Sequence, residues 1–385
     1  MMKRIISLLS IVALLVVPVA RAQQTEPISI TTLNVDGLPQ TILVFNLNAD
    51  GPGDAGTSRI GKYLKRKGTD IVCMQEDFNY HNVLVPWLED DYHFDQWSGA
   101  VGIDLPDKKI DFLHAQNEQF ACDGLGACWR NSIVETATER VAWKQSFGKF
   151  SHAADELVTK GFRRSELTLA SGVRIIVYNM HMDAGDLADE KEGKDTKDRE
   201  ARLSQWQQLC EDVLAHLDTR PIIIVGDMNS YYCRDKIKAE FIDKIAASGK
   251  GIASDVWVEL KRQGNYPDPK EGVVFTEDSA NLLDGESLDK IIYINPSTGT
   301  KLQPHSFEMD TESYKHEDKP LGDHSPVSAT FTILDDKTGV STITQEAAVA
   351  DTPLYYNLNG QPVTRPAKGL FIEHQGQENR KRIIK

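Results

Sequence analysis

Short runs of apolar, mostly β-branched residues alternate along this chain with segments of helical periodicity. The clearest run covers residues 222–225, and Gly226, Asp227 and Asn229 follow it. Four consecutive apolar residues predict a strand that is buried on both faces. Asp227 and Asn229 are two residues apart, so in an extended chain their side chains point to the same side. The pattern predicts a carboxylate and a carboxamide together at a strand end, although a plain polar turn has the same residues.

Further strands are predicted over residues 28–33, 70–74, 163–169, 173–179, 288–294 and 328–334. Helices are predicted over residues 59–67, 199–217 and 241–247, and the second of them has one apolar face. Strands that alternate with helices, some of them joined by tight turns, predict an α/β layered fold with mixed sheets. The sequence has no glycine-rich phosphate loop, nucleophile elbow or dinucleotide fingerprint.

Polar residues with catalytic potential lie at the ends of these strands. They are Asn34, Glu76, His181, Asp227, Asn229, Asp289, Asp323 and His324. Open α/β sheets bind ligands at the edge that strand ends form. One histidine beside a strand is usually structural, but two histidines and four carboxylates so placed are hard to explain by packing. A buried carboxylate costs free energy unless it is paired or binds a metal.

In this order the residues resemble a known superfamily. The matching segments are Asn34, Gln75-Glu76, His181-x-Asp183, Gly226-Asp-x-Asn229, Leu288-Asp289 and Asp323-His324. They resemble the endonuclease/exonuclease/phosphatase superfamily, which has the DNase I-like fold, over residues 28–334. The resemblance implies a four-layer sandwich, in which two mixed β-sheets pack together with helices outside. It also implies metal-dependent cleavage of a phosphate ester.

The resemblance assigns the metal site to three of these residues. Glu76 is expected to be the main ligand of Mg²⁺ (or Mn²⁺), with Asn34 close to the metal or the phosphate. Asp323 is expected to assist the metal or His324. A hard cation with carboxylate ligands suits phosphate oxygens.

The resemblance assigns the chemistry to the other five. His324 is expected to be the base that activates water, with Asp289 orienting its imidazole. Asp227 is expected near the attacking water. His181 and Asn229 are expected to hold the phosphoryl oxygens. A histidine base is effective near neutral pH.

Within the superfamily, the chain resembles secreted sphingomyelinase C-type phosphodiesterases. The motifs are Asn34-Val35-x-Gly37-Leu38, Glu76-x-Phe78, Asp123-Gly124-Leu125 and Lys160-Gly161-Phe162. There are departures: Gly322 stands where serine commonly precedes Asp-His, and Lys290 follows Asp289 where an aromatic residue is usual. Residues 309–319 hold one aromatic, Tyr314, where membrane-attacking members carry an aromatic hairpin. Deep insertion into a bilayer is therefore not expected.

The expected substrate is a phosphodiester lipid headgroup, as in sphingomyelin, and the expected products are ceramide and phosphocholine. Contact with a membrane surface would be peripheral, and a monomer is expected. The alternatives are a secreted endonuclease on the same fold, a phosphoinositide or other phosphatase, and a non-catalytic surface protein. The formal net charge of −14 weighs against unspecific binding of nucleic acid, although a nuclease with a local cationic or metal-bearing cleft is still compatible.

The N-terminus has the pattern of a signal peptide over residues 1–22. Lys3 and Arg4 precede an apolar run, and Ala20-Arg21-Ala22 fits a cleavage site. A secreted, periplasmic or cell-surface location is expected. The predicted organisation continues with a catalytic domain over residues 27–335, a linker over 336–353 and a small β element over 354–385. This last element resembles the sorting-type β domains of proteins exported by some Gram-negative bacteria.

The five cysteines have no metal-site spacing. Export makes disulfides possible. Cys122 and Cys128 flank a glycine-containing loop and are expected to pair, and Cys210 and Cys233 are a second candidate pair. The connectivity stays open because four cysteines allow three arrangements. Cys73 lies in an apolar run and is predicted to be a buried small hydrophobic residue.

Overall fold

The computed structural model describes residues 24–42, 45–46, 48–97, 122–148, 151–156, 158–185, 194–268, 286–335, 354–356, 362–363, 368–375 and 378–384. The expected signal peptide and linker lie outside these residues. The chain divides into two compact units, Met1–Asp336 and Lys337–Lys385, and each is described by itself.

The first sheet of the larger unit has, among the described residues, six strands in the order β13-β16-β1-β4-β6-β5. The strands are β1 (Gln24–Asn34), β4 (Ile71–Gln75), β5 (Tyr92–Phe94), β6 (Gly126–Arg130), β13 (Lys301–Met309) and β16 (Val327–Asp335). β1 runs parallel to β4 and antiparallel to β16, so the sheet is mixed.

The second sheet has the same number of strands in the described part of the chain, in the order β11-β12-β10-β9-β8-β7. They are β7 (Val134–Ala142), β8 (Gly161–Thr168), β9 (Arg174–His181), β10 (Ile222–Asp227), β11 (Gly251–Asp255) and β12 (Asp289–Pro296). β10 runs parallel to β9 and antiparallel to β12. Every residue of β10 is buried, as the apolar run predicts.

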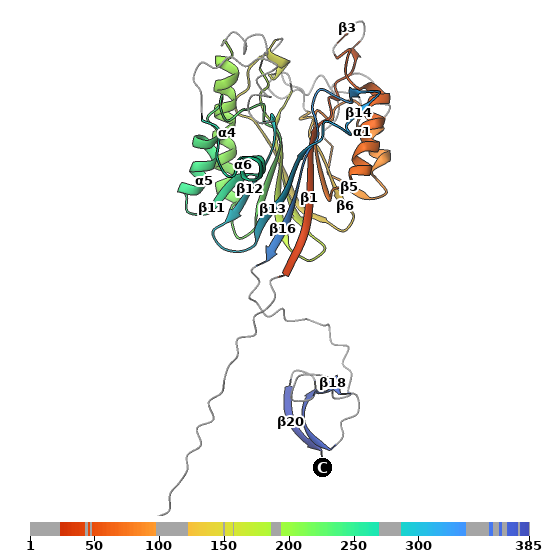
Figure 1. Cartoon of the computed structure of the whole chain (residues 1–385), viewed down its shortest axis with the longest axis vertical. Helices are drawn as coiled ribbons and strands as arrows, with labels where there is room; N and C mark the ends of the chain where they lie inside the picture. The colour runs from red at the N-terminus through yellow and green to blue at the C-terminus, as the bar shows by residue number, and fades with distance from the viewer. Residues whose placement is uncertain are drawn as a thin grey trace, which may run out of the picture. The chain divides into compact units, whose positions relative to one another are not determined.

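Helices cover the outer faces of the two sheets. They are α1 (Gly53–Lys67), α2 (His81–Leu84), α4 (Thr196–His216), α5 (Asp243–Ala247) and α6 (Val256–Arg262). Figure 1 shows α1 on one side of the sandwich and α4 and α5 on the other, with both sheets between them. The expected four-layer sandwich of two mixed β-sheets is therefore confirmed. None of the described helices is both long enough and apolar enough to cross a membrane.

Helix α1 shows how local sequence and packing combine. Ile60 and Leu64 are fully buried and Tyr63 nearly so, because this helix face packs on the first sheet in a cluster with Val72. The helix begins at Gly53 rather than at the predicted residue 59. Glycine lowers helix propensity, which is why the pattern did not extend to the first turns.

Smaller elements complete the two units. Two short hairpins are formed by β2 (Thr41–Ile42) with β3 (Phe45–Asn46), and by β14 (Lys315–His316) with β15 (Lys319–Pro320). The second unit contains a sheet whose described strands are β17 (Leu354–Tyr356), β18 (Pro362–Val363), β19 (Gly369–Gln375) and β20 (Glu378–Ile384). Their pairings are antiparallel, in the order β18-β17-β19-β20.

The expected Cys122–Cys128 disulfide is wrong, and so is the second candidate pair. All five cysteines lie in the described residues and all are free and buried. Cys128 packs toward α1 in a cluster with Val72, whereas Cys122 precedes the strand and its carbonyl accepts a hydrogen bond from the Thr159 backbone. The two thiols lie in different surroundings, so their short spacing in the sequence does not bring them together.

We expect all five thiols to resist alkylation in the native protein. Burial raises the pKa of Cys122 to about 12 and that of Cys128 well above its ordinary value, so little reactive thiolate forms. Mass spectrometry after maleimide treatment should find unmodified cysteines in the native protein and five modified cysteines after unfolding in denaturant. Recovery of a Cys122–Cys128 linked peptide from non-reduced protein would contradict the structure.

Candidate active site

Strand pairing brings the predicted polar strand ends to one edge of the sandwich. Asn34 is the last residue of β1, paired with the end of β4, and Glu76 follows directly. In the second sheet, Asp227 pairs with His181 on the parallel strand β9 and with Asp289 on the antiparallel strand β12. An antiparallel strand starts where its neighbour ends, so the first residue of β12 meets the last residue of β10.

Gly226 lies inside β10 rather than ending the strand, because β10 continues to Asp227. Its φ of 145° is in the region that favours glycine, and a Cβ at this position would lie 2.0 Å from the Met180 carbonyl oxygen. The close approach of β9 to β10 therefore requires glycine here. It also fixes where the Asp227 side chain emerges.

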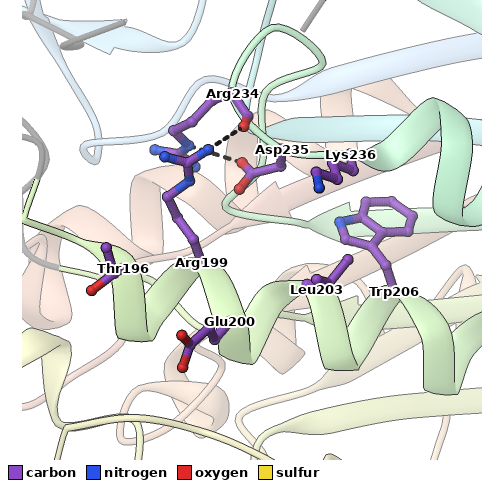
Figure 2. A pocket seen from close by; sticks show the side chains of 8 residues that line it. All are labelled: Thr196, Arg199, Glu200, Leu203, Trp206, Arg234, Asp235 and Lys236. Atoms are coloured by element: carbon purple, nitrogen blue, oxygen red, sulfur yellow. Dashed lines mark hydrogen bonds and ion pairs between the residues drawn. The ribbon is translucent and has the colours of Figure 1, made fainter. Parts of the chain in front are cut away.

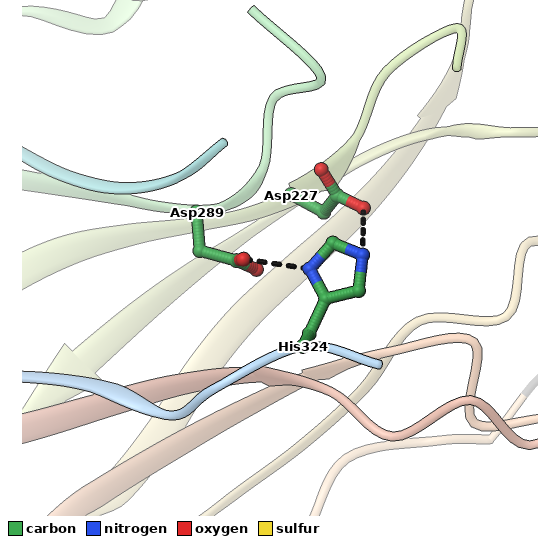
Figure 3. Close-up of side chains that lie close together, drawn as sticks. All are labelled: Asp227, Asp289 and His324. Atoms are coloured by element: carbon green, nitrogen blue, oxygen red, sulfur yellow. Dashed lines mark hydrogen bonds and ion pairs between the residues drawn. The ribbon is translucent and has the colours of Figure 1, made fainter. Parts of the chain in front are cut away.

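His324 lies between two carboxylates, as Figure 3 shows. Its Nδ1 donates to Asp289 Oδ2 at 2.7 Å, and its Nε2 lies 3.6 Å from Asp227 Oδ2. Burial alone would lower the pKa of His324, but Asp289 and Asp227 outweigh this and raise it well above its ordinary value. The imidazole is therefore held in one orientation and readily accepts a proton.

Asp227 connects most of the site. Its Oδ2 accepts a hydrogen bond from Asn34 Nδ2 at 3.2 Å, and its Oδ1 accepts one from the Asn229 backbone at 3.0 Å. The Asn229 side chain donates to the Met182 carbonyl at 3.1 Å. Burial raises the pKa of Asp227 to about 6, against the opposing charge of His324. Asn34 and Asn229 thus reach this carboxylate from different sheets and loops.

His181 differs from His324 in its protonation. Burial, Lys160 and His324 lower the pKa of His181 well below its ordinary value. Its Nε2 accepts a hydrogen bond from Lys160 Nζ at 3.2 Å, so the ring proton is on Nδ1. The 3.4 Å approach of Nε2 to Asp227 is accordingly not an ion pair. Nδ1 is buried and has no hydrogen-bond partner among the described residues, which leaves a donor for a ligand oxygen.

Lys160 belongs to this group but was not among the predicted site residues. Its Nζ forms an ion pair with Asp155 and lies beside His181. Burial would lower the pKa of Lys160, but Asp155 and Glu76 raise it, so the ammonium stays charged. The sequence signal for this residue was the motif Lys160-Gly161-Phe162. A lysine is almost never fully buried unless it is paired, and here the partner is Asp155. Nothing in the sequence around Asp155 marked it as the partner.

The predicted metal residues share a second part of the site. Glu76 Oε1 accepts a hydrogen bond from Asn34 Nδ2 at 2.9 Å, and burial raises the pKa of Glu76. Burial and the nearby Asp323 raise the pKa of Asp36 to about 7. Asp323 itself is exposed and has no hydrogen bond to the described residues. Three carboxylates thus repel one another here, an arrangement that a hard cation would relieve.

Another set of possible metal ligands consists of His324 and the two carboxylates beside it. Ligand atoms of Asp227, Asp289 and His324 lie within 4.8 Å of one another. Asp289 Oδ1 is buried and has no partner in the described part of the chain. Both nitrogens of His324, however, already face carboxylates. The structure brings together all the predicted residues, with the exposed Asp323 close enough to affect the pKa of Glu76 and of His324, and their individual roles stay predictions.

Comparison with known proteins places this geometry in context. The sequence matches no protein family model. Proteins called sphingomyelinase from Mycobacterium bovis and Mycobacterium tuberculosis are 25% identical to it over 314 residues, which are 81% of this chain and 54% of each relative. The chain thus spans about half the length of the curated relatives it matches.

The chain is also similar to solved structures. A humanized TDP2 from D. rerio gives a TM-score of 0.50 at 17% identity, covering 79% of this chain and 98% of that chain. An endonuclease/exonuclease/phosphatase from Bacteroides vulgatus gives 0.48 at 15% identity, covering 80% and 98%. The resemblance predicted from the sequence is confirmed: the chain has the DNase I-like fold and is similar in sequence to proteins called sphingomyelinase.

Proposed function

We propose that this chain is a secreted, divalent-metal-dependent phosphodiesterase of sphingomyelinase C type, which hydrolyses sphingomyelin to ceramide and phosphocholine. The observation that carries the proposal is the imidazole of His324 held between Asp289 and Asp227, beside the neutral imidazole of His181. A base and a hydrogen-bond donor at one strand edge suit attack of water on a phosphate ester. The similarity to proteins called sphingomyelinase supports the choice of headgroup.

A metal ion fits the carboxylate part of the site. Glu76 and Asn34 would hold Mg²⁺ or Mn²⁺. Asp323 lies close enough to raise the pKa of both Glu76 and Asp36. Oxygen ligands of this kind are those that hard cations take in proteins. When bound, the cation would offset the negative charge that develops on the phosphoryl group.

Proton transfer and hydrogen bonding to the phosphate would be carried out by side chains of the protein. His324 Nε2 would take the proton of the attacking water, while Asp289 holds the ring through Nδ1. Asp227 would stabilise the imidazolium from the Nε2 side. His181 Nδ1 would donate to a phosphoryl oxygen, because Lys160 occupies Nε2 and fixes this tautomer.

The substrate can be tested with a panel of sphingomyelin, phosphatidylcholine, phosphoinositides and DNA, each with Mg²⁺. We expect release of phosphocholine from sphingomyelin at the highest kcat/KM. Asn229→Ala, which removes a proposed phosphoryl contact, should lower kcat/KM on the preferred substrate. Rapid cleavage of DNA with intact sphingomyelin would instead support the nuclease alternative.

We expect the acid limb of the pH profile to lie above the pKa of a free imidazole, about 6.5. The base must be neutral, and Asp289 and Asp227 raise the pKa of His324, so kcat/KM should fall as pH drops through this raised value. Asp289→Asn should move the midpoint to lower pH because it removes one of the two charges. Asp243→Asn, in an exposed ion pair with Lys238, is the control and should leave the midpoint unchanged. A midpoint that Asp289→Asn does not move would exclude His324 as the titrating base.

A further inference from the structure

A group of basic side chains outside the candidate active site lies between α4 and the segment after β10. A surface pocket of about 240 Å³ is lined by Thr196, Arg199, Glu200, Leu203, Trp206, Arg234, Asp235 and Lys236. We call it the basic pocket. Figure 2 shows the Arg199 side chain rising from α4 toward Arg234. The Arg199 guanidinium donates a hydrogen bond to the Arg234 carbonyl at 2.9 Å, so the two arginines lie next to each other.

Two cations of the basic pocket, Arg199 and Lys236, are not balanced by carboxylates of the described residues. Asp235 pairs with Arg234, whose Nε lies 2.8 Å from Oδ2, and it also lies 3.4 Å from Nε of the buried Arg202, which has Asp195 as a second partner. No carboxylate of the described residues forms an ion pair with Arg199 or with Lys236. Like charges held close together cost free energy in the folded state. In a chain of formal net charge −14, this local excess of cations favours a bound anion.

The other acidic residue of the pocket does not change this balance. The Glu200 carboxylate pairs with Lys197 at 3.3 Å, and both side chains are largely exposed. Exposed pairs of this kind contribute little free energy. Arg234, by contrast, is only 5% exposed, so its guanidinium is fixed by its surroundings and is not a mobile surface group. Arg234 therefore positions Arg199 through its carbonyl, and the half-buried Arg199 and the exposed Lys236 are the cations that a ligand can reach.

The basic pocket lies at the same edge of the sandwich as the candidate active site. Helix α4 follows the end of β9, and Arg234 follows the end of β10. Arg234 Nη2 also donates a hydrogen bond to the backbone carbonyl of Asn229. One buried side chain thus contacts both the basic pocket and the loop that carries Asn229. A group bound in the pocket would face the same side of the molecule as the substrate.

We propose that the basic pocket binds an oxyanion group of phosphate type, separate from the ester that is cleaved. Guanidinium groups bind such oxygens in a bidentate way, and lysine adds a point charge. The half-buried Leu203 offers apolar surface to an organic part of the ligand. The phosphate can belong to a soluble compound or to the headgroup of an anionic lipid. The proposal goes beyond the proposed function because it involves no bond cleavage.

The direct test is equilibrium dialysis of the full chain against radiolabelled inorganic phosphate in EDTA. EDTA removes metal-bridged phosphate binding at the candidate active site, so the difference between the variants reports on the basic pocket. In Arg199→Gln/Lys236→Gln we expect an affinity loss of about tenfold or more, because charge-assisted hydrogen bonds are removed. The control Lys238→Gln/Lys244→Gln also removes two positive charges, from nearby exposed ion pairs, and should bind like the wild type.

Sedimentation with vesicles identifies the source of the phosphate. If vesicles of phosphatidylcholine and phosphatidic acid bind the wild type and the control but not the pocket variant, the ligand is a lipid headgroup. If these vesicles bind none of the proteins while the pocket variant still loses inorganic phosphate, the ligand is a soluble compound. Equal phosphate binding by all three proteins, or none by the wild type, overturns the proposal. Thermal unfolding of each variant verifies that it is folded.

Discussion

His324→Ala is expected to lower kcat on sphingomyelin by about 10²–10⁴-fold, the usual contribution of a general base. KM should change little, because the interaction lost is made in the transition state rather than with bound substrate. His324 is suited to this role since Asp289 holds Nδ1 at 2.7 Å and leaves Nε2 facing Asp227. Initial rates across a range of substrate concentrations separate the two constants.

The control for this variant is His316→Ala, which makes the same change at an exposed position of β14. It should keep the kinetics of the wild type. His324→Ala leaves Asp227 and Asp289 facing each other without a cation, so its thermal unfolding should be measured alongside. A folded His324→Ala protein with nearly normal kcat would show that another group is the base.

Glu76→Gln is expected to lower kcat by about 10²-fold or more, the effect of losing one strong electrostatic contact in a preorganised site. The amide keeps the shape of the side chain and its contact with Asn34, but removes the charge that would hold the cation. EDTA should inactivate the wild type to a similar extent, and added Mg²⁺ should restore it. Activity that survives EDTA would contradict the metal mechanism.

Metal binding by Glu76 can be measured without activity. Mg²⁺ that binds only the folded protein raises its melting temperature by mass action. The wild type should show this increase, and so should Glu308→Gln, which changes an exposed glutamate that pairs with Lys67. Glu76→Gln should not. The same increase in all three proteins would place the cation elsewhere.

Without metal, Glu76→Gln should be at least as stable as the wild type at neutral pH. Burial raises the pKa of Glu76, so the folded state binds its proton more tightly than the unfolded state does. The free energy of unfolding therefore falls as pH rises past the ordinary pKa of a glutamate. A neutral amide does not titrate, so the variant keeps this unfolding free energy at neutral pH. A variant at least as stable as the wild type would mark Glu76 as a functional carboxylate rather than one that stabilises the fold.

Strands with regular patterns were predicted well, and irregular ones were not. The central strand β10 is an unbroken apolar run whose two faces are both covered, so its pattern is visible locally. β13 was not predicted from the sequence. Leu302, Pro304 and Phe307 are its buried residues, and a bulge between Pro304 and Ser306 shifts the alternation by one position. A period of two cannot be recognised across such a shift.

The sequence by itself determined which side chains emerge at the strand ends, because apolar runs and the residues that follow them are local features. The ordered set from Asn34 to His324 was readable in this way. Only the tertiary structure decided how these groups ionise. His181 and His324 have the same side chain, yet Lys160 and burial keep the first neutral while Asp289 and Asp227 favour the charged form of the second. Packing likewise separated Cys122 from Cys128 and brought Arg199 to Arg234. Such effects depend on distances between segments far apart in the chain, which no local pattern encodes.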